Sequence, residues 1–110
     1  MQLLSRPARL FDGPLAAGQL VTIPVAGLMG IATNAIGAVL TLRVVRANKG
    51  GWLYAGPVGA VPTVSTLDYN AGQTDDGFPV TLLTDGRLTL YSTQPLSRLV
   101  IDATGFLVTA

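Results

Sequence analysis

Few side chains in this chain are able to do acid–base, nucleophilic or metal chemistry. The 110 residues include no His, no Cys and no Glu. Zinc sites, histidine-based triads and pairs of catalytic glutamates are therefore excluded. The four serines have no base to activate them, and Lys49 lies beside glycines, without the apolar pocket or neighbouring cation that activates a lysine nucleophile. We therefore expect a protein that is not an enzyme and that uses no cofactor.

An acidic pair is the remaining candidate for metal chemistry. Asp75 and Asp76 precede Gly77, and with Asp68 or Asp85 they could bind Ca²⁺. Calcium takes six or more oxygen ligands, and no EF-hand spacing is present. A solvated turn is the favoured interpretation, and no metal is expected.

The charge of the chain is low and scattered. Charged residues make up 12% of the sequence, hydrophobic residues 49%, and the net charge is +1. Nucleic-acid binding needs clustered Lys and Arg to neutralise phosphates. We expect no nucleic-acid partner, and we expect a folded chain with a sizeable core rather than a disordered one.

The elements that would position these side chains are short strands. Period-two alternation, many Thr and frequent Gly and Pro predict strands at residues 19–25, 38–47, 51–56, 64–70, 78–83, 87–92 and 97–108. Residues 48–51 and the Asp85-Gly86 pair predict tight turns that return the chain as hairpins. Residues 27–35 are expected to cross the end of the fold, with room for one helical turn. The sequence predicts a single all-β domain over residues 1–110, an antiparallel β-sandwich or closed barrel of about seven to eight short strands.

A charge-free stretch at residues 13–42 raises the question of a membrane span. Prolines and glycines interrupt it at Pro14, Gly18, Pro24, Gly27, Gly30 and Gly37. A spanning helix needs about 20 consecutive apolar residues, so no span is expected. The start of the chain lacks a charged segment followed by an apolar one, so no secretory signal peptide is expected.

Several short motifs occur in order along the chain. They are P-x-R-L-x-D at residues 7–12, V-A-G-x-x-G-[VI] at 25–31, an apolar strand at 38–44, G-aromatic-L at 51–53, S-x-L-[ND]-[FY]-x-x-G-Q-T at 65–74, D-G at 85–86 and [IV]-D-x-x-G-[YF] at 101–106. Together they resemble a β-rich repeat domain of surface and secreted proteins of actinobacteria, which also occurs in virion proteins of their tailed phages. The resemblance implies a β-rich fold and carries no catalytic residues.

Asp102 stands out because apolar residues surround it in the last predicted strand. A buried carboxylate is tolerated when it is paired and hydrogen-bonded. The motifs place a matching cation, Arg9, in the first segment. We expect Arg9 and Asp102 to form a buried structural pair that ties the first segment to the last strand; the alternative is an Asp102 that points into solvent from an edge strand.

Two function classes remain. The first is a non-enzymatic virion structural protein of a tailed bacteriophage, such as a capsid decoration protein or small tail component, assembled in the host cytoplasm and in contact with capsid or tail subunits and with further copies of itself. The second is a cell-surface or cell-wall carbohydrate-binding module of a secreted bacterial protein. In either class we expect contacts at aromatic and uncharged surface. The candidate interface residues are Trp52, Tyr54, Leu28, Met29 and Ile31.

Overall fold

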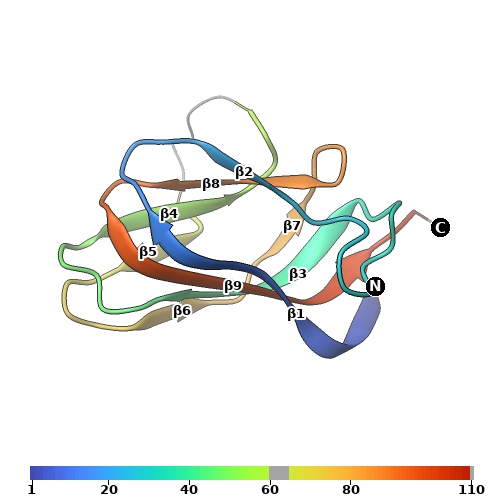
Figure 1. Ribbon diagram of the computed structural model, residues 1–110, viewed down its shortest axis with the longest axis horizontal. Helices are drawn as coiled ribbons and strands as arrows, with labels where there is room; N and C mark the ends of the chain where they lie inside the picture. Colours follow the sequence, from blue (N-terminus) through green and yellow to red (C-terminus); the bar gives the residue numbers. More distant parts are fainter. Residues whose placement is uncertain (60–64, 110) are drawn as a thin grey trace.

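Residues 1–59 and 65–109 are described in the computed structural model, and they form two antiparallel β-sheets packed face to face (Figure 1). Sheet A contains, in spatial order, β1 (Gln2–Leu15), β9 (Leu96–Leu107) and β3 (Gly37–Val44), followed by β6 (Asp75–Gly77) and β7 (Val80–Leu82), which both pair with β3. Sheet B contains, in order, β2 (Val21–Pro24), β8 (Arg87–Ser92), β4 (Gly51–Gly56) and β5 (Leu67–Tyr69). No helix of the described residues is long and apolar enough to cross a membrane.

The core lies between the two sheets and is built from alternate residues of the central strands. Successive side chains of a strand point to opposite faces of its sheet, so one face of each strand supplies the core. The fully buried large side chains are Leu40, Leu42, Val44, Leu99 and Ile101 from sheet A and Leu53, Leu88 and Leu90 from sheet B, together with Val25. Full burial of each such side chain contributes about 1.5–3 kcal/mol relative to exposure.

The predicted fold class is confirmed as an all-β antiparallel sandwich. The barrel alternative is not observed, because the described chain divides into two separate sheets. Nine strands are described, where about seven or eight were expected. The two elements without a sequence-based prediction are β1 and the three-residue β6. Residue 64, the first of one predicted strand, lies outside the described residues, and that strand begins at Leu67.

β1 is the longest strand and the one that the sequence pattern does not reveal. Its pairing with β9 shifts register between Leu3 and Ala8, and again between Arg9 and Phe11. Each shift interrupts the alternation of side chains, so the sequence of β1 has no sustained period of two. Gln2 pairs with Phe106, which places the two ends of the chain at the same end of the molecule (Figure 1).

Two turns that were expected to close hairpins instead carry the chain between the sheets, so the pairing predictions were wrong. β3 belongs to sheet A and β4 to sheet B; likewise β7 belongs to sheet A and β8 to sheet B. Asp85 and Gly86 do form a tight turn, with φ of 51° and 75°, and Thr84 and Arg87 exchange two backbone hydrogen bonds of 3.0 Å. A two-residue turn sets the backbone direction of its immediate neighbours only. The sheet to which each flanking strand belongs depends on its pairing with strands farther away in the sequence.

The connection at residues 27–35 crosses from β2 in sheet B to β3 in sheet A, as expected. It contains turns and bends but no helical turn.

A buried hydrogen-bonded pair lies in the core between β5 and β8. Tyr69 and Ser92 are 2% and 0% exposed, and their hydroxyl oxygens lie 2.6 Å apart. Ser92 also donates to the Gln94 carbonyl at 2.7 Å, so this buried polar group is satisfied.

Candidate functional site

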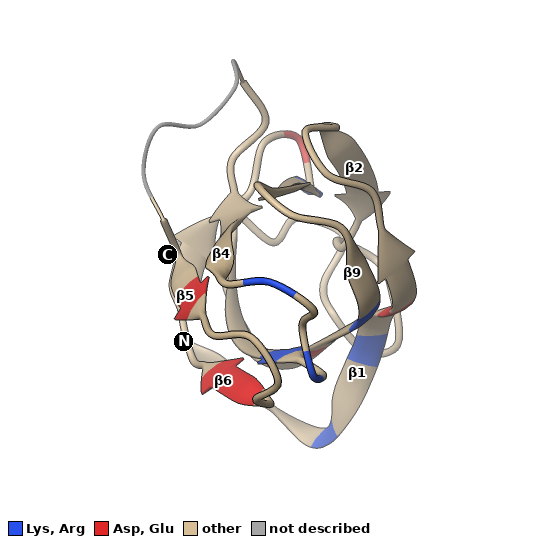
Figure 2. Cartoon of the chain, turned by 90° about the vertical axis from the view of Figure 1, so that its left-hand side faces the viewer, with Lys and Arg blue, Asp and Glu red and all other residues tan. Residues whose placement is uncertain are grey.

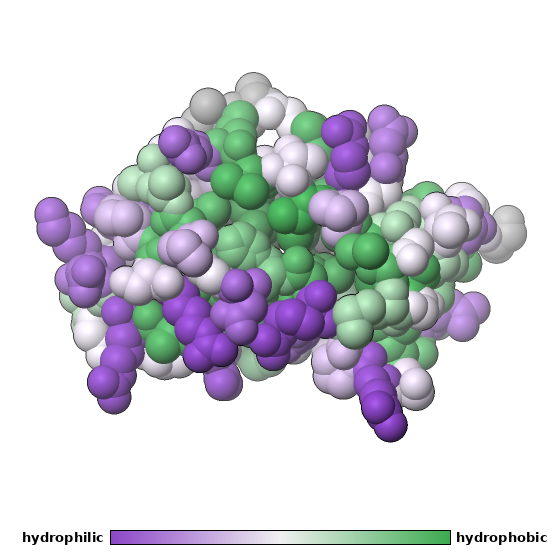
Figure 3. All heavy atoms as spheres, viewed as in Figure 1, coloured by the Kyte–Doolittle hydropathy of each residue, from purple (hydrophilic) through white to green (hydrophobic). Residues whose placement is uncertain are grey.

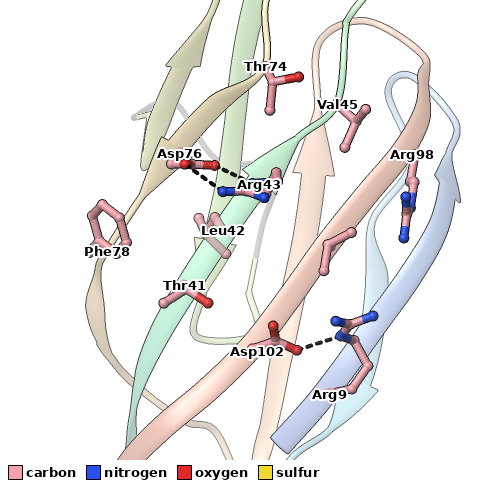
Figure 4. A pocket seen from close by; sticks show the side chains of 11 residues that line it. Arg9, Thr41, Leu42, Arg43, Val45, Thr74, Asp76, Phe78, Arg98 and Asp102 are labelled. Atoms are coloured by element: carbon pink, nitrogen blue, oxygen red, sulfur yellow. Dashed lines mark hydrogen bonds and ion pairs between the residues drawn. The ribbon is translucent and has the colours of Figure 1, made fainter. Parts of the chain in front are cut away.

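The outer face of sheet A carries most of the ion pairs of the molecule. Because Leu99, Ile101 and Ala103 of β9 point into the core, the residues between them point outward. The same alternation turns Thr41 and Arg43 of β3 outward. Between these side chains runs a shallow groove of about 540 Å³, here called the charged groove (Figure 4). Thr41, Arg43 and Asp76 lie on one side, Arg9 and Arg98 lie on the other, and Asp102 lies between them.

Arg9 and Asp102 are brought together across neighbouring strands. They are direct partners in the β1–β9 ladder, and Arg9 Nε donates to Asp102 Oδ1 at 2.5 Å. The expected burial is wrong: the Arg9 side chain is 50% exposed and the Asp102 side chain 21%. Asp102 lies on a central strand between β1 and β3, but on its outer side, so its apolar neighbours in the sequence face the opposite way. The hydrogen bond to Asp102 is the main reason that the pKa of Arg9 is raised.

Asp12 links two arginines into a network. Arg98 donates to it through Nε at 2.9 Å and through Nη2 at 3.1 Å, and Arg9 Nη1 donates at 3.0 Å. The pKa of Asp12 is lowered, chiefly by the hydrogen bonds from Arg98. Asp12 also lies in the P-x-R-L-x-D motif, but the sequence gives no sign of its pairing with Arg98, 86 residues away.

Arg43 and Asp76 form a second, separate pair on the other side of the groove. They are direct partners in the β3–β6 ladder. Arg43 donates through Nε at 2.8 Å and through Nη2 at 3.0 Å to the two oxygens of Asp76, a bidentate arrangement (Figure 4). The hydrogen bonds lower the pKa of Asp76 and raise that of Arg43.

These charges balance one another. Three arginines, Arg9, Arg43 and Arg98, meet three aspartates, Asp12, Asp76 and Asp102. All six side chains take part in these ion pairs, and among the described residues that line the groove no hydroxyl group is hydrogen-bonded to a carboxylate. Figure 2 shows acidic residues on β5 and β6 and basic residues on β1, so both signs of charge occur at this end of the molecule. The groove is therefore suited to neutral, polar recognition rather than to attraction of a polyanion.

Beside the charged groove the same face of sheet A is apolar. Val80 and Leu82 of β7 pair with Val39 and Gly37 of β3, so their side chains share the outer face with Val39. Phe78, Val80 and Leu82 are 73%, 60% and 59% exposed. We call these three residues the apolar edge. The sequence pattern predicts a strand at residues 78–83 but not its exposure, because alternating apolar residues ordinarily form the core side of a strand.

A second apolar surface lies on the outer face of sheet B. Trp52 and Tyr54 alternate with the buried Leu53 and Ala55, so both point outward. Tyr91 of β8 is the ladder partner of Tyr54, and its ring lies 5.6 Å from that of Trp52, at 39°. The Tyr54 hydroxyl donates to the Pro57 carbonyl at 3.1 Å. This aromatic cluster of Trp52, Tyr54 and Tyr91 is half-buried, so it offers less free surface than the apolar edge.

The remaining candidate interface residues differ in their surroundings. Met29 is 66% exposed and Leu28 is half-buried. Ile31 is only 3% exposed and belongs to the core, so its assignment to an interface is wrong. Ile31 points from this connection into the hydrophobic core and packs there.

The sandwich is open along the side where β1 and β2 form the edges of the two sheets. There, a green strip of apolar residues is visible above a row of purple, hydrophilic ones (Figure 3). A groove of about 460 Å³ on this side is lined by residues that include Phe11, Leu15, Val21 and Leu96. Leu15 and Leu96 are buried, and Phe11 and Val21 are half-buried, so this strip is the rim of the core.

The carboxylates considered for calcium are engaged separately. Asp75 Oδ2 accepts from the Asn70 N–H at 2.8 Å, Asp68 accepts from Ser65 at 2.7 Å, and Asp76 is paired with Arg43. Over residues 1–59 and 65–109, no three acidic side chains gather into a group that could hold a metal ion.

Comparison of the chain with protein-family models, with curated proteins and with solved structures found no match.

Proposed function

We propose that this protein is a non-enzymatic structural subunit of a tailed-bacteriophage virion, such as a capsid decoration protein or small tail component, that docks through the outer face of sheet A. The observation that carries the docking is the apolar edge. Three large apolar side chains are each more than half exposed: Val80 and Leu82 on β7, and Phe78 two residues before it. Contiguous exposed apolar surface of this kind marks sites of association.

The surroundings of the apolar edge resemble those of a protein interface. The centre of an interface is apolar and depleted of charge, whereas its rim is polar. Here the uncharged segment from Gly77 to Thr84 lies next to the charged groove, whose paired side chains are available as such a rim. Balanced charge in the groove adds specificity and does not call for a strongly charged partner. The partners in this proposal are capsid or tail subunits and other copies of the chain, assembled in the host cytoplasm, with no nucleic acid involved.

The choice of a virion as the assembly rests on the resemblance of the sequence motifs to a domain found in tailed-phage proteins.

A second candidate function is a cell-surface or cell-wall carbohydrate-binding module of a secreted bacterial protein, and the aromatic cluster favours it. Aromatic faces stack on sugar rings, and Trp52, Tyr54 and Tyr91 lie together on the outer face of sheet B.

Binding measurements with two variants separate these candidates. Leu82→Lys places a charge in the apolar edge, and Trp52→Ala removes the largest ring of the aromatic cluster. Each variant and the wild type are incubated with purified particles of the phage that encodes the chain, and separately with insoluble cell-wall glycan. We expect particle binding that Leu82→Lys abolishes and Trp52→Ala retains. Glycan binding that Trp52→Ala abolishes, without binding to particles, would overturn the proposal in favour of the second candidate.

A further inference from the structure

The side of β7 away from β3 carries backbone hydrogen-bonding groups that no other described strand uses. The Leu82 carbonyl accepts from the neighbouring Thr81 hydroxyl at 3.1 Å and keeps a second lone pair. Thr81 is paired with Ala38 of β3, and the flanking bonds run from Leu40 N–H to the Pro79 carbonyl at 2.9 Å and from Leu83 N–H to the Ile36 carbonyl at 2.8 Å. In an antiparallel ladder, hydrogen bonds to one neighbour come from every second residue. The backbone groups of Val80 and Leu82 therefore point away from β3.

Within the described part of the chain, no strand lies beyond β7. A free edge of this kind offers N–H and C=O groups to another strand, and proteins limit such pairing with charged side chains, prolines, bulges or short edge strands. The segment from Gly77 to Thr84 carries no charge. The short length of β7, three residues, limits how many bonds the edge can form.

We propose that β7 pairs antiparallel with β7 of a second copy of this chain, about a two-fold axis at Thr81. This inference rests on the proposed function, in which the protein works in several copies, and it names the strand and register of their contact. The free groups of Val80 lie opposite those of Leu82 of the second copy, and the reverse pair follows by symmetry. Each of these two pairs exchanges two backbone hydrogen bonds, and the two sheets A become one continuous sheet.

A second copy fits this edge because the edge is complementary to itself. The free backbone groups stand at equal spacing on either side of Thr81, which is the condition for a two-fold antiparallel pair. Paired residues of an antiparallel ladder project from the same face, so the apolar edges of the two copies join on the outer face. Neither copy brings a charge into the contact, and so no repulsion opposes it.

The register gives a direct test, because the natural chain has no cysteine. Thr81 would face Thr81 of the second copy as a non-hydrogen-bonded pair, with Cα atoms about 4.5 Å apart, which is within the range that a disulfide spans. Two Val80 residues would be diagonal neighbours, about 7–8 Å apart, beyond that range. We expect Thr81→Cys to form a disulfide-linked dimer under mild oxidation and Val80→Cys to remain monomeric.

A second measurement does not depend on a cysteine. The Val80 N–H points away from β3, so Val80→Pro removes a bond of the contact and none of the fold. We expect the mass of the wild type, measured by sedimentation, to rise towards that of a dimer with concentration, whereas Val80→Pro stays a monomer. At low concentration, where both are monomers, the two should have the same melting temperature.

Two results would overturn the pairing. One is a wild type that remains monomeric up to about 1 mM, a concentration at which even very weak complexes form. The other is cross-linking of Val80→Cys as fast as that of Thr81→Cys. A monomeric wild type that still binds phage particles would refute the pairing alone, whereas a dimer that binds no particle would refute the proposed function alone.

Discussion

Asp102 shows why a carboxylate is tolerated in a strand of otherwise apolar residues. Its neighbours Ile101 and Ala103 point into the core, and Asp102 points to the outer face, where Arg9 donates to it. The sequence allowed the partner to be identified, because both residues lie in motifs of the first and last segments. The burial of Asp102 was overestimated, because its apolar neighbours point to the core face of β9 and give no information about the outer face to which Asp102 points.

The exposure of the pair changes the expected effect of removing it. Asp102→Ala should lower the free energy of unfolding only slightly, because exposed ion pairs contribute little and Arg9 keeps its bond to Asp12. Leu99→Ala on the same strand should cost about 2–5 kcal/mol, because it empties part of the core. Urea unfolding of the two variants checks the comparison, and an Asp102→Ala loss as large as that of Leu99→Ala would show that the pair is buried after all.

The paired carboxylates also predict how stability depends on pH. In the folded protein the pKa values of Asp12 and Asp76 lie below their ordinary value of 3.8. Their contribution is therefore complete above that value and is lost as the pH falls through the folded pKa, where the unfolded chain binds more protons. The loss should be small, because both pairs are exposed to solvent and salt.

Unfolding free energies at a series of acidic pH values measure this effect. Asp76→Asn should show a shallower fall in stability below pH 3.8 than the wild type. Arg43→Gln should show the same shallower fall, because it removes the donor that lowers the pKa of Asp76. An unchanged acid slope in Arg43→Gln would contradict the assigned cause.

At the scale of elements, strands with regular alternation were predictable and irregular ones were not. β3, β4, β8 and β9 lie where the period-two pattern placed them. β1 was missed because register shifts break its pattern. The pairing of β7 and β8 was mispredicted because Asp85 and Gly86 specify the turn, whereas the choice of sheet depends on contacts with strands far away in the sequence.

The Asp85-Gly86 turn can be tested with a matched pair of glycines. Gly86 and Gly18 have φ of 75° and 73°, a conformation that costs a non-glycine residue about 1–2 kcal/mol. A Cβ added at Gly86 would lie 2.7 Å from the Cβ of Ala26, whereas one at Gly18 would have no atom within 4 Å. Gly86→Ala should therefore destabilise more than Gly18→Ala, by about 1–3 kcal/mol for the added overpacking. Equal losses in thermal unfolding would mean that the contact with Ala26 relaxes freely.

At the scale of the whole molecule, two outward faces compete as binding surfaces. The sequence pointed to Trp52 and Tyr54, and the structure adds Tyr91 beside them. It did not point to the apolar edge, because the exposed side of an apolar strand cannot be recognised before the sheet order is known. The greater exposure of Phe78, Val80 and Leu82 is the reason that the proposed interface is on sheet A.

Hydroxyl-radical footprinting measures this assignment most directly, because it reports the solvent exposure of each aromatic side chain in the free protein and in the assembled particle. Phe78, which is 73% exposed in the isolated chain, should be oxidised when free and protected on assembly. Trp52 and Tyr91, on the opposite sheet, should be oxidised equally in both states. Protection of Trp52 and Tyr91 with unchanged oxidation of Phe78 would contradict the account and move the interface to sheet B.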